Sequence, residues 1–143
     1  MTRKKNNIKI PENYKPTAKE SFMNPVMQRY FHQKLLDWKG QILSDTGITL
    51  EKLKAGSEPE ADLADRAASE ADRTVELRTR ERARKLIAKI DSALARIENN
   101  SYGYCEETQE PISINRLDAR PIATLTIEAQ EMHELHERTH RDD

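Results

Sequence analysis

Two carboxylates, Asp62 and Asp65, stand three positions apart in a segment that follows a turn-forming stretch at residues 55–60. At this spacing on a helix the two side chains share one face, and the first turn of a helix attracts negative charge. The pair can therefore cap its own helix, or it can reach a metal ion or basic groups on a partner. Two carboxylates alone make a weak metal site, so a functional role requires groups from another protein.

A run of basic residues follows on the same predicted helix. Its members are Arg78, Arg80, Arg82, Arg84, Lys85 and Lys89. Because they surround more than one face of a helix, some of them are ordinary solvated charges. The others predict contact with a phosphate-bearing ligand or with an acidic surface of a partner.

A third group has the spacing of a zinc finger but lacks most of its ligands. The four positions Cys105, Thr108, Thr126 and Ala129 follow a CxxC…CxxC pattern. Four cysteines at this spacing bind structural zinc, whereas a lone thiolate cannot. We therefore predict no zinc here and a knuckle held by apolar side chains. The candidates for this small core are Ile112, Ile114, Leu117, Ile122, Leu125 and Ile127.

Three histidines near the end of the sequence, His133, His136 and His140, have helical spacing and could bind a metal ion. They lie in a strongly charged stretch among glutamates, which favours a solvated helix surface instead.

The composition excludes several classes of protein. Charged residues make up 34% of the 143 residues and hydrophobic residues 36%, which is too little apolar surface for a large round core. The 24 basic and 25 acidic residues nearly cancel, so a generally basic nucleic-acid-binding protein is not indicated. One cysteine cannot form an intramolecular disulfide, and no apolar run approaches the roughly 20 residues of a membrane span. We expect a cytoplasmic protein without a signal peptide.

Two long helices must position the charged groups. The first begins at Asn24-Pro25, an N-cap followed by proline, and its apolar residues recur every three or four positions as far as Ile42. Gly47 predicts a softened point in this helix. The second helix is expected from about residue 61 to residue 99. Its heptad seam consists of Ala83, Ile87, Ile90, Leu94 and Ile97.

Together these elements predict a mainly α protein with a long antiparallel two-helix coiled coil, a small degenerate zinc-finger-like globular region and a C-terminal helix. Residues 1–24 are expected to be a flexible basic segment, and residues 25–100 the coiled-coil hairpin with its tip near 55–67. Residues 101–124 are expected to form the knuckle, and residues 102–120 lack helical periodicity. Residues 125–143 are expected to form the final helix and tail, packing with the knuckle.

The sequence resembles the DksA family of bacterial transcription factors from about residue 22 to residue 137. The resemblance rests on the order and spacing of short motifs, each of which is modest alone. They are Asp62-x-x-Asp65-Arg66-Ala67, Val75-Glu76-Leu77-Arg78-x-Arg80, Arg84-Lys85-Leu86-Ile87-x-Lys89-Ile90, Tyr102-Gly103-Tyr104-Cys105 and Arg116-Leu117-x-Ala119-Arg120-Pro121.

This resemblance implies a regulator that inserts its coiled coil into the secondary channel of RNA polymerase. With the alarmone ppGpp, such a factor destabilises open promoter complexes in the stringent response, represses ribosomal RNA promoters and activates some biosynthetic promoters. By the same resemblance, Asp62, Asp65 and Ala67 match the active tip motif DxxDxA, and Arg82 matches a position that contacts polymerase.

The resemblance also implies a ppGpp pocket lined by Leu86, Lys89 and Arg120. The family has a further lysine where this sequence has Gln130. With Cys105 as the one remaining cysteine, the protein resembles a zinc-independent member that has no structural cofactor. We expect a monomer whose partners are RNA polymerase and ppGpp, with no membrane and no sequence-specific DNA binding.

Two alternatives remain open. One is a transcript-cleavage or elongation-type channel factor, which uses a similar acidic tip to coordinate Mg²⁺ for RNA cleavage. The other is a plain coiled-coil interaction module that associates through its apolar stripes. We predict no catalytic residues and do not expect an enzyme, because the acidic pair lacks a pocket and nothing supplies a nucleophile.

Overall fold

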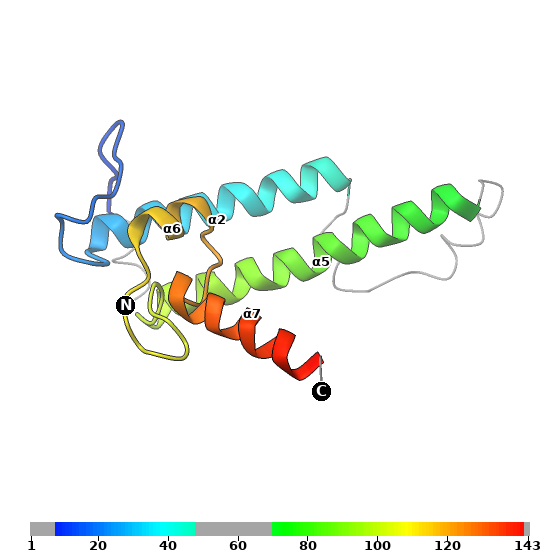
Figure 1. Cartoon of the computed structure of the whole chain (residues 1–143). Coiled ribbons are helices and arrows are strands. Elements are labelled where there is room, and N and C mark those ends of the chain that lie inside the picture. Colours follow the sequence, from blue (N-terminus) through cyan, green and yellow to red (C-terminus); the bar gives the residue numbers. More distant parts are fainter. Residues whose placement is uncertain (1–7, 48–69, 142–143) are drawn as a thin grey trace. The chain divides into compact units, whose positions relative to one another are not determined.

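A computed structural model describes residues 8–47 and 70–141, which contain four helices. These are α2 (Pro25–Thr46), α5 (Glu70–Glu98), α6 (Ile114–Ala119) and α7 (Ile127–Arg141) (Figure 1). The described ranges contain no strand, only an isolated antiparallel bridge between Tyr104 and Pro111. The predicted mainly α class is therefore confirmed. None of the described helices is long and apolar enough to span a membrane.

Helix α2 begins at the N-cap that the sequence predicts. The backbone N–H of Met27 donates to Oδ1 of Asn24 at 3.0 Å, and Pro25 occupies the first helical position, where no N–H partner is needed. The helix ends at Thr46, and Gly47 follows with a φ of +64°, a left-handed conformation typical of glycine after a helix. Gly47 thus follows the helix end, and is not the softened point within a helix that the sequence predicted.

The seam of α5 is buried at four of its five predicted positions. At the fifth predicted position, Leu94 is only half-buried, and its neighbour Ala93 is fully buried instead. A strict heptad drifts around a helix of 3.6 residues per turn, so the most buried position moves to the neighbouring residue. The four confirmed positions are Ala83, Ile87, Ile90 and Ile97.

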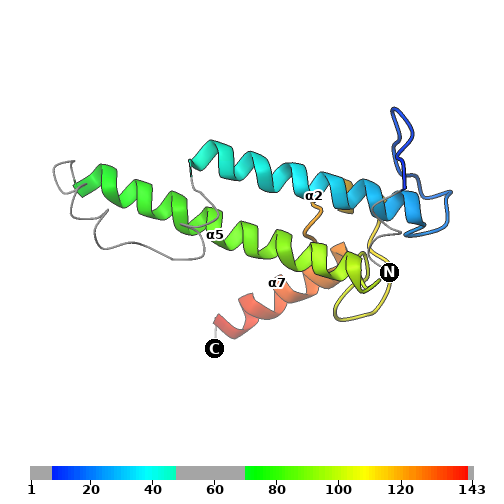
Figure 2. The same ribbon diagram turned by 180° about the vertical axis from the view of Figure 1, so that it is seen from behind.

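The described residues form two compact units. The first contains the residues up to Leu35 and those from Ser92 onward, and the second contains the described residues between Leu36 and Asp91. In the second unit, the α2 and α5 segments lie side by side in both views (Figures 1 and 2). An ion pair between Nζ of Lys39 and Oδ1 of Asp91, at 2.8 Å, joins these two segments.

Several side chains of residues 8–24 are packed, whereas composition predicts a flexible segment at 1–24, of which residues 1–7 lie outside the described ranges. Met23 is buried, the hydroxyl of Tyr14 donates to Glu20 at 2.8 Å, and Phe22 meets the ring of Tyr104 edge-on at a centroid distance of 5.3 Å. The many polar residues of this segment led to the expectation of flexibility. Composition cannot show that its few apolar side chains contact residues that are distant in the sequence.

Gly103 allows this segment to approach the knuckle closely. Its φ of +92° disfavours any residue with a side chain. A Cβ added there would lie 2.9 Å from Cε of Met23 and 3.0 Å from Cζ of Phe22. The backbone conformation therefore requires glycine, and a Cβ would in addition force the ends of the Met23 and Phe22 side chains to shift.

Helix α6 lies within the stretch that was predicted to lack helical periodicity, and this prediction is wrong for residues 114–119. The side chain of Ser113 caps the helix by accepting from the backbone N–H of Arg116 at 3.2 Å, and Ile114 and Leu117 are buried one turn apart. A helix of six residues is too short to establish a periodic pattern. Its N-cap serine was the available signal.

Candidate functional site

Three of the predicted contact residues, Arg82, Leu86 and Lys89, share one face of α5 because they are spaced four and three residues apart. Arg82 and Lys89 are exposed, and Leu86 is half-buried beside the seam. In the part of the chain that the structure describes, neither of these cations forms an ion pair, whereas nearby Arg80 pairs with Glu76 at 2.6 Å. The face thus presents two positive charges around an apolar side chain, which suits an anionic group or an acidic surface.

Arg120 extends from a firmly held turn that follows α6. Its backbone N–H donates to the carbonyl of Arg116 at 2.7 Å, and its own carbonyl accepts from Ala123 at 2.9 Å. The carbonyl of the next residue, Pro121, accepts from the buried hydroxyl of Tyr102 at 2.8 Å. Burial raises the pKa of Tyr102, so this hydroxyl remains a donor. The backbone of Arg120 is therefore fixed while its exposed guanidinium can bind a phosphate through two parallel hydrogen bonds.

The predicted ppGpp-pocket residues are divided between the two units, because Leu86 and Lys89 belong to the second and Arg120 to the first. Gln130, on α7, lies where the family resemblance implies a lysine. Its amide Nε2 lies 3.3 Å from Oε1 of Glu134. This position therefore has a carboxylate beside it and no positive charge of its own.

The four positions with zinc-finger spacing come together in the first unit. The hydroxyl of Thr126 lies 3.9 Å from Sγ of Cys105 and accepts from the backbone N–H of Ala129 at 3.2 Å. The hydroxyl and the backbone of Thr108 also hydrogen-bond to Cys105. Cys105, Thr126 and Ala129 are all buried. The geometry of a finger is thus kept, with hydrogen bonds between the positions that would hold the metal.

This set of side chains does not fit zinc. One thiol, two neutral hydroxyls and a methyl group offer a single good ligand, where a structural zinc site uses four. Burial alone would raise the pKa of Cys105, but hydrogen bonds from Thr108, Thr126 and Glu107 lower it to about 7. Within residues 8–47 and 70–141, no group of three or more histidine, cysteine, aspartate or glutamate residues is arranged to hold a metal ion.

The described histidines of α7 lie at the surface and are not grouped around a common point that could hold a metal ion. Nε2 of His133 is paired with Oε1 of Glu107, a residue of the loop that carries Cys105, and both side chains are about half exposed. His136 is exposed, and the side chain of His140 lies outside the described residues. The His133 pair therefore connects α7 with the knuckle loop at the surface.

Backbone hydrogen bonds and a small apolar core hold the knuckle. The N–H of Cys105 donates to Glu110 at 2.8 Å, and the N–H of Ile112 donates to Gly103 at 2.7 Å. Of the predicted core, three side chains are buried and two are half-buried, but Ile127 is 48% exposed. Ile127 starts α7 two residues before buried Ala129, which places it on the opposite side of that helix. The buried three are Ile112, Ile114 and Leu117; the half-buried two are Ile122 and Leu125.

One acidic residue near Arg120 was missed by the sequence reasoning. Oδ1 of Asp118, on α6, accepts hydrogen bonds from the hydroxyl of Tyr30 at 2.6 Å and from Nζ of Lys34 at 2.7 Å. The partners lie 88 and 84 residues away along the sequence, so no local motif predicts this cluster.

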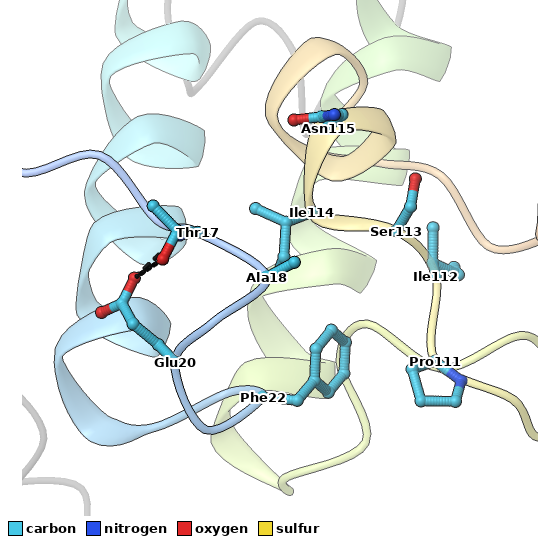
Figure 3. A pocket seen from close by; sticks show the side chains of 9 residues that line it. All are labelled: Thr17, Ala18, Glu20, Phe22, Pro111, Ile112, Ser113, Ile114 and Asn115. Carbon is cyan, nitrogen blue, oxygen red and sulfur yellow. Dashed lines mark hydrogen bonds between the residues drawn. The ribbon is translucent and has the colours of Figure 1, made fainter.

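A pocket of about 230 Å³ lies between residues 17–22 and residues 111–115 (Figure 3). Phe22, Ile112 and Ile114 provide apolar walls. Glu20 is the titratable side chain among the lining residues, and it accepts hydrogen bonds from the backbone of Thr17 at 2.7 Å and from a tyrosine hydroxyl. These bonds lower the pKa of Glu20 and leave the pocket without an uncommitted acid or base.

Two family profiles match consecutive parts of the chain. The profile of the DnaK suppressor protein DksA, N-terminal domain, matches residues 27–97. The profile of the prokaryotic dksA/traR C4-type zinc finger matches residues 100–135. The second match covers the knuckle, in which one of the four cysteines that the name implies is present.

Several curated proteins are similar over nearly the whole chain. The RNA polymerase-binding transcription factor DksA of Caulobacter vibrioides NA1000 is 59% identical over 130 residues, which cover 91% of this chain and 92% of that protein. Its namesake from Escherichia coli K12 is 35% identical over 127 residues, covering 89% and 84%. The solved structure of transcription factor DksA2 from Pseudomonas aeruginosa is 39% identical, with a TM-score of 0.67 over 85% of this chain and 95% of that one.

Proposed function

The chain belongs to the DksA family of transcription factors, and we propose that it acts by binding RNA polymerase through the secondary channel. The observation that carries this proposal is the 59% identity over 91% of the chain to a factor named for polymerase binding. The mainly helical fold and the nearly balanced charge agree with a protein that recognises polymerase rather than DNA sequence.

The α5 face supplies the polymerase contact in this proposal. Exposed Arg82 is the principal contact with an acidic surface of the channel. Because the neighbouring seam residues are buried, a charge change at Arg82 alters the surface without altering the core. Polymerase affinity should therefore be separable from folding stability.

The tip carries the regulatory effect in this proposal. Asp62, Asp65 and Ala67 lie outside the described residues, and their assignment rests on the DxxDxA pattern. The two carboxylates would act near the catalytic Mg²⁺ or the basic residues around it. Such contacts shift a pre-existing equilibrium away from stable open complexes, so promoters with short-lived complexes should respond most.

The alarmone ppGpp is the proposed co-regulator, bound between the factor and polymerase. Lys89 and Arg120 provide phosphate donors and Leu86 an apolar contact. The uncharged Gln130 beside Glu134 removes one phosphate donor, so the response to ppGpp should be weaker than in a relative with lysine there.

Zinc is not part of the proposed mechanism, because the four finger positions offer one thiol. The chain acts as a cytoplasmic monomer that needs no metal, and its thiol chemistry is confined to Cys105. In this respect the chain differs from a zinc finger, which unfolds when its metal is removed.

The test is transcription from a ribosomal RNA promoter with purified cognate polymerase, in a zinc-chelated buffer, with and without ppGpp. Inhibition that deepens with ppGpp supports the whole proposal. Inhibition without deepening removes the alarmone part, and no effect overturns the proposal. A parallel assay on backtracked complexes separates this function from transcript cleavage, because a cleavage factor would shorten the RNA.

A further inference from the structure

The Asp118 cluster joins α6 to α2 within the first unit. A single carboxylate oxygen accepts from Tyr30 at 2.6 Å and from Lys34 at 2.7 Å. The two donors stand four residues apart on α2 and therefore on one face of it. Figure 1 shows α6 alongside the first half of α2, as these bonds require.

The donors are themselves held in place. The ring of Tyr30 meets Tyr14 edge-on at 5.8 Å and Phe31 at 5.2 Å, and the ammonium of Lys34 lies 5.7 Å from the centre of the Tyr30 ring. Side-chain exposure is 35% for Lys34 and 25% for Asp118, so water screens the pair only in part. Hydrogen bonds with a charged partner are short and directional, unlike apolar contacts.

Direction matters here because α6 is only six residues long. Buried Ile114 and Leu117 attach it to the core, and Nε of Arg116 donates to the carbonyl of Leu125 at 2.9 Å. The Asp118 bonds add a direct connection to α2 two residues before Arg120, whose backbone N–H donates to the carbonyl of Arg116 at the end of the same helix. Lys34 also balances the negative charge of Asp118 on this side of α6.

We propose that Asp118, held by Tyr30 and Lys34, is a positioning residue for Arg120 and orients its guanidinium toward the phosphates of ppGpp. This inference rests on the proposed function, since Arg120 is assigned to the ppGpp pocket there. It adds residues from α2 that do not touch the ligand to the determinants of the alarmone response.

The experiment compares Asp118→Asn, Asp118→Glu and Lys34→Met with the wild type in the transcription assay. The neutral amide of the Asp118→Asn variant lacks the negative charge that pairs with Lys34. The ppGpp concentration that gives half of the maximal increase in inhibition should therefore rise roughly tenfold. Inhibition without ppGpp should stay within about twofold. Glutamate keeps the charge and should restore part of the response. Lys39→Met, which breaks an ion pair of similar length in the second unit, is the matched control and should leave the ppGpp dependence unchanged.

Hydrogen–deuterium exchange on the free, full-length chain tests the positioning separately from the alarmone. Asp118→Asn should accelerate exchange in peptides covering residues 114–123 and leave those covering α5 unchanged. Normal exchange there, or a normal ppGpp response in Asp118→Asn, overturns the inference. If the wild type inhibits transcription but does not respond to ppGpp, the assignment of the ppGpp pocket is wrong. The role proposed for Asp118 then falls with it, even if the exchange data show that Asp118 holds α6 in place.

Discussion

The knuckle, taken together with Thr126 directly before α7, and the α5 face of Arg82, Leu86 and Lys89 use their polar groups in opposite ways. In the knuckle, the polar groups of Cys105 and Thr126 are buried and hydrogen-bonded to one another. On the α5 face, the charges of Arg82 and Lys89 are exposed. The difference indicates that substitutions in the knuckle change the free energy of unfolding, whereas substitutions on the α5 face change binding. Each of the following predictions tests this contrast.

The largest expected effect is conversion of the knuckle into a metal site. The triple substitution Thr108→Cys, Thr126→Cys and Ala129→Cys would complete four thiol ligands at positions that already converge. Zinc binding at such sites contributes on the order of 10 kcal/mol, so one zinc per chain should be retained and the Tm should fall on chelation. Metal analysis and melting with and without a chelator measure this. Thr108→Cys alone is the control and should hold no tightly bound zinc.

The next effect concerns the hydroxyl of Thr126. In Thr126→Val, the backbone N–H of buried Ala129 loses its acceptor and Cys105 loses a partner. A buried donor without a partner costs about 1–3 kcal/mol, so the free energy of unfolding in urea should fall by that amount. Thr126→Ser keeps the hydroxyl and should lose less. A fully stable valine variant would mean that the apolar core alone holds the knuckle.

A smaller effect, on binding only, is expected from Arg82→Glu. Reversal of this exposed charge should weaken polymerase binding by about tenfold or more, and more strongly at low salt. The free energy of unfolding should change by less than about 0.5 kcal/mol. Lys19→Glu makes the same charge change at an exposed site of the first unit and should leave affinity unchanged. Equal loss in both variants would indicate a net-charge effect instead of a specific contact.

The Asp118 cluster predicts a pH dependence of stability. Burial by itself would raise the pKa of Asp118, but the hydrogen bonds from Lys34 and Tyr30 and the charges of Lys34 and Lys15 hold it below its ordinary value of 3.8. A carboxyl with a lowered pKa in the folded state contributes stability above its ordinary pKa and loses it as the pH falls through the folded value. Urea unfolding below about pH 4 should therefore show a steeper loss in the wild type than in Asp118→Asn. Parallel curves would contradict the assigned shift.

The smallest effect is expected at the exposed pair of His133 and Glu107. Surface ion pairs contribute less than about 1 kcal/mol, so His133→Gln should leave the free energy of unfolding almost unchanged. A larger loss in urea unfolding would place this pair among the structural ties of the knuckle, with Thr126.

The sequence predicted the elements that depend on local or regular signals. The Asn24 cap and the seam of α5 are of this kind, because each is written in a few neighbouring residues or in a repeat. It did not predict α6, whose six residues are too few to show a repeating pattern, or the burial of Met23 and the packing of Phe22 against Tyr104, a residue distant in the sequence. Asp118 escaped for the same reason, since its partners Tyr30 and Lys34 are on another helix.

For the candidate site, the sequence identified residue types better than their surroundings. The family motifs named Arg82, Lys89 and Arg120, and the structure adds that all three side chains are exposed. Three of the four finger positions were recognised as unable to bind zinc from their chemistry alone. That they meet as a hydrogen-bonded group required the fold, because Cys105 and Thr126 are 21 residues apart.

Gly103 has a consequence for how such sequences can change over generations. An alanine at this position would force the ends of the Met23 and Phe22 side chains to shift, and its backbone conformation would remain strained even after they had moved. Position 103 therefore tolerates only glycine. Positions 22 and 23 tolerate only side chains that pack over a residue without a Cβ. Among diverging copies of this gene, position 103 should remain glycine, and changes at positions 22 and 23 should be limited to side chains that pack over it.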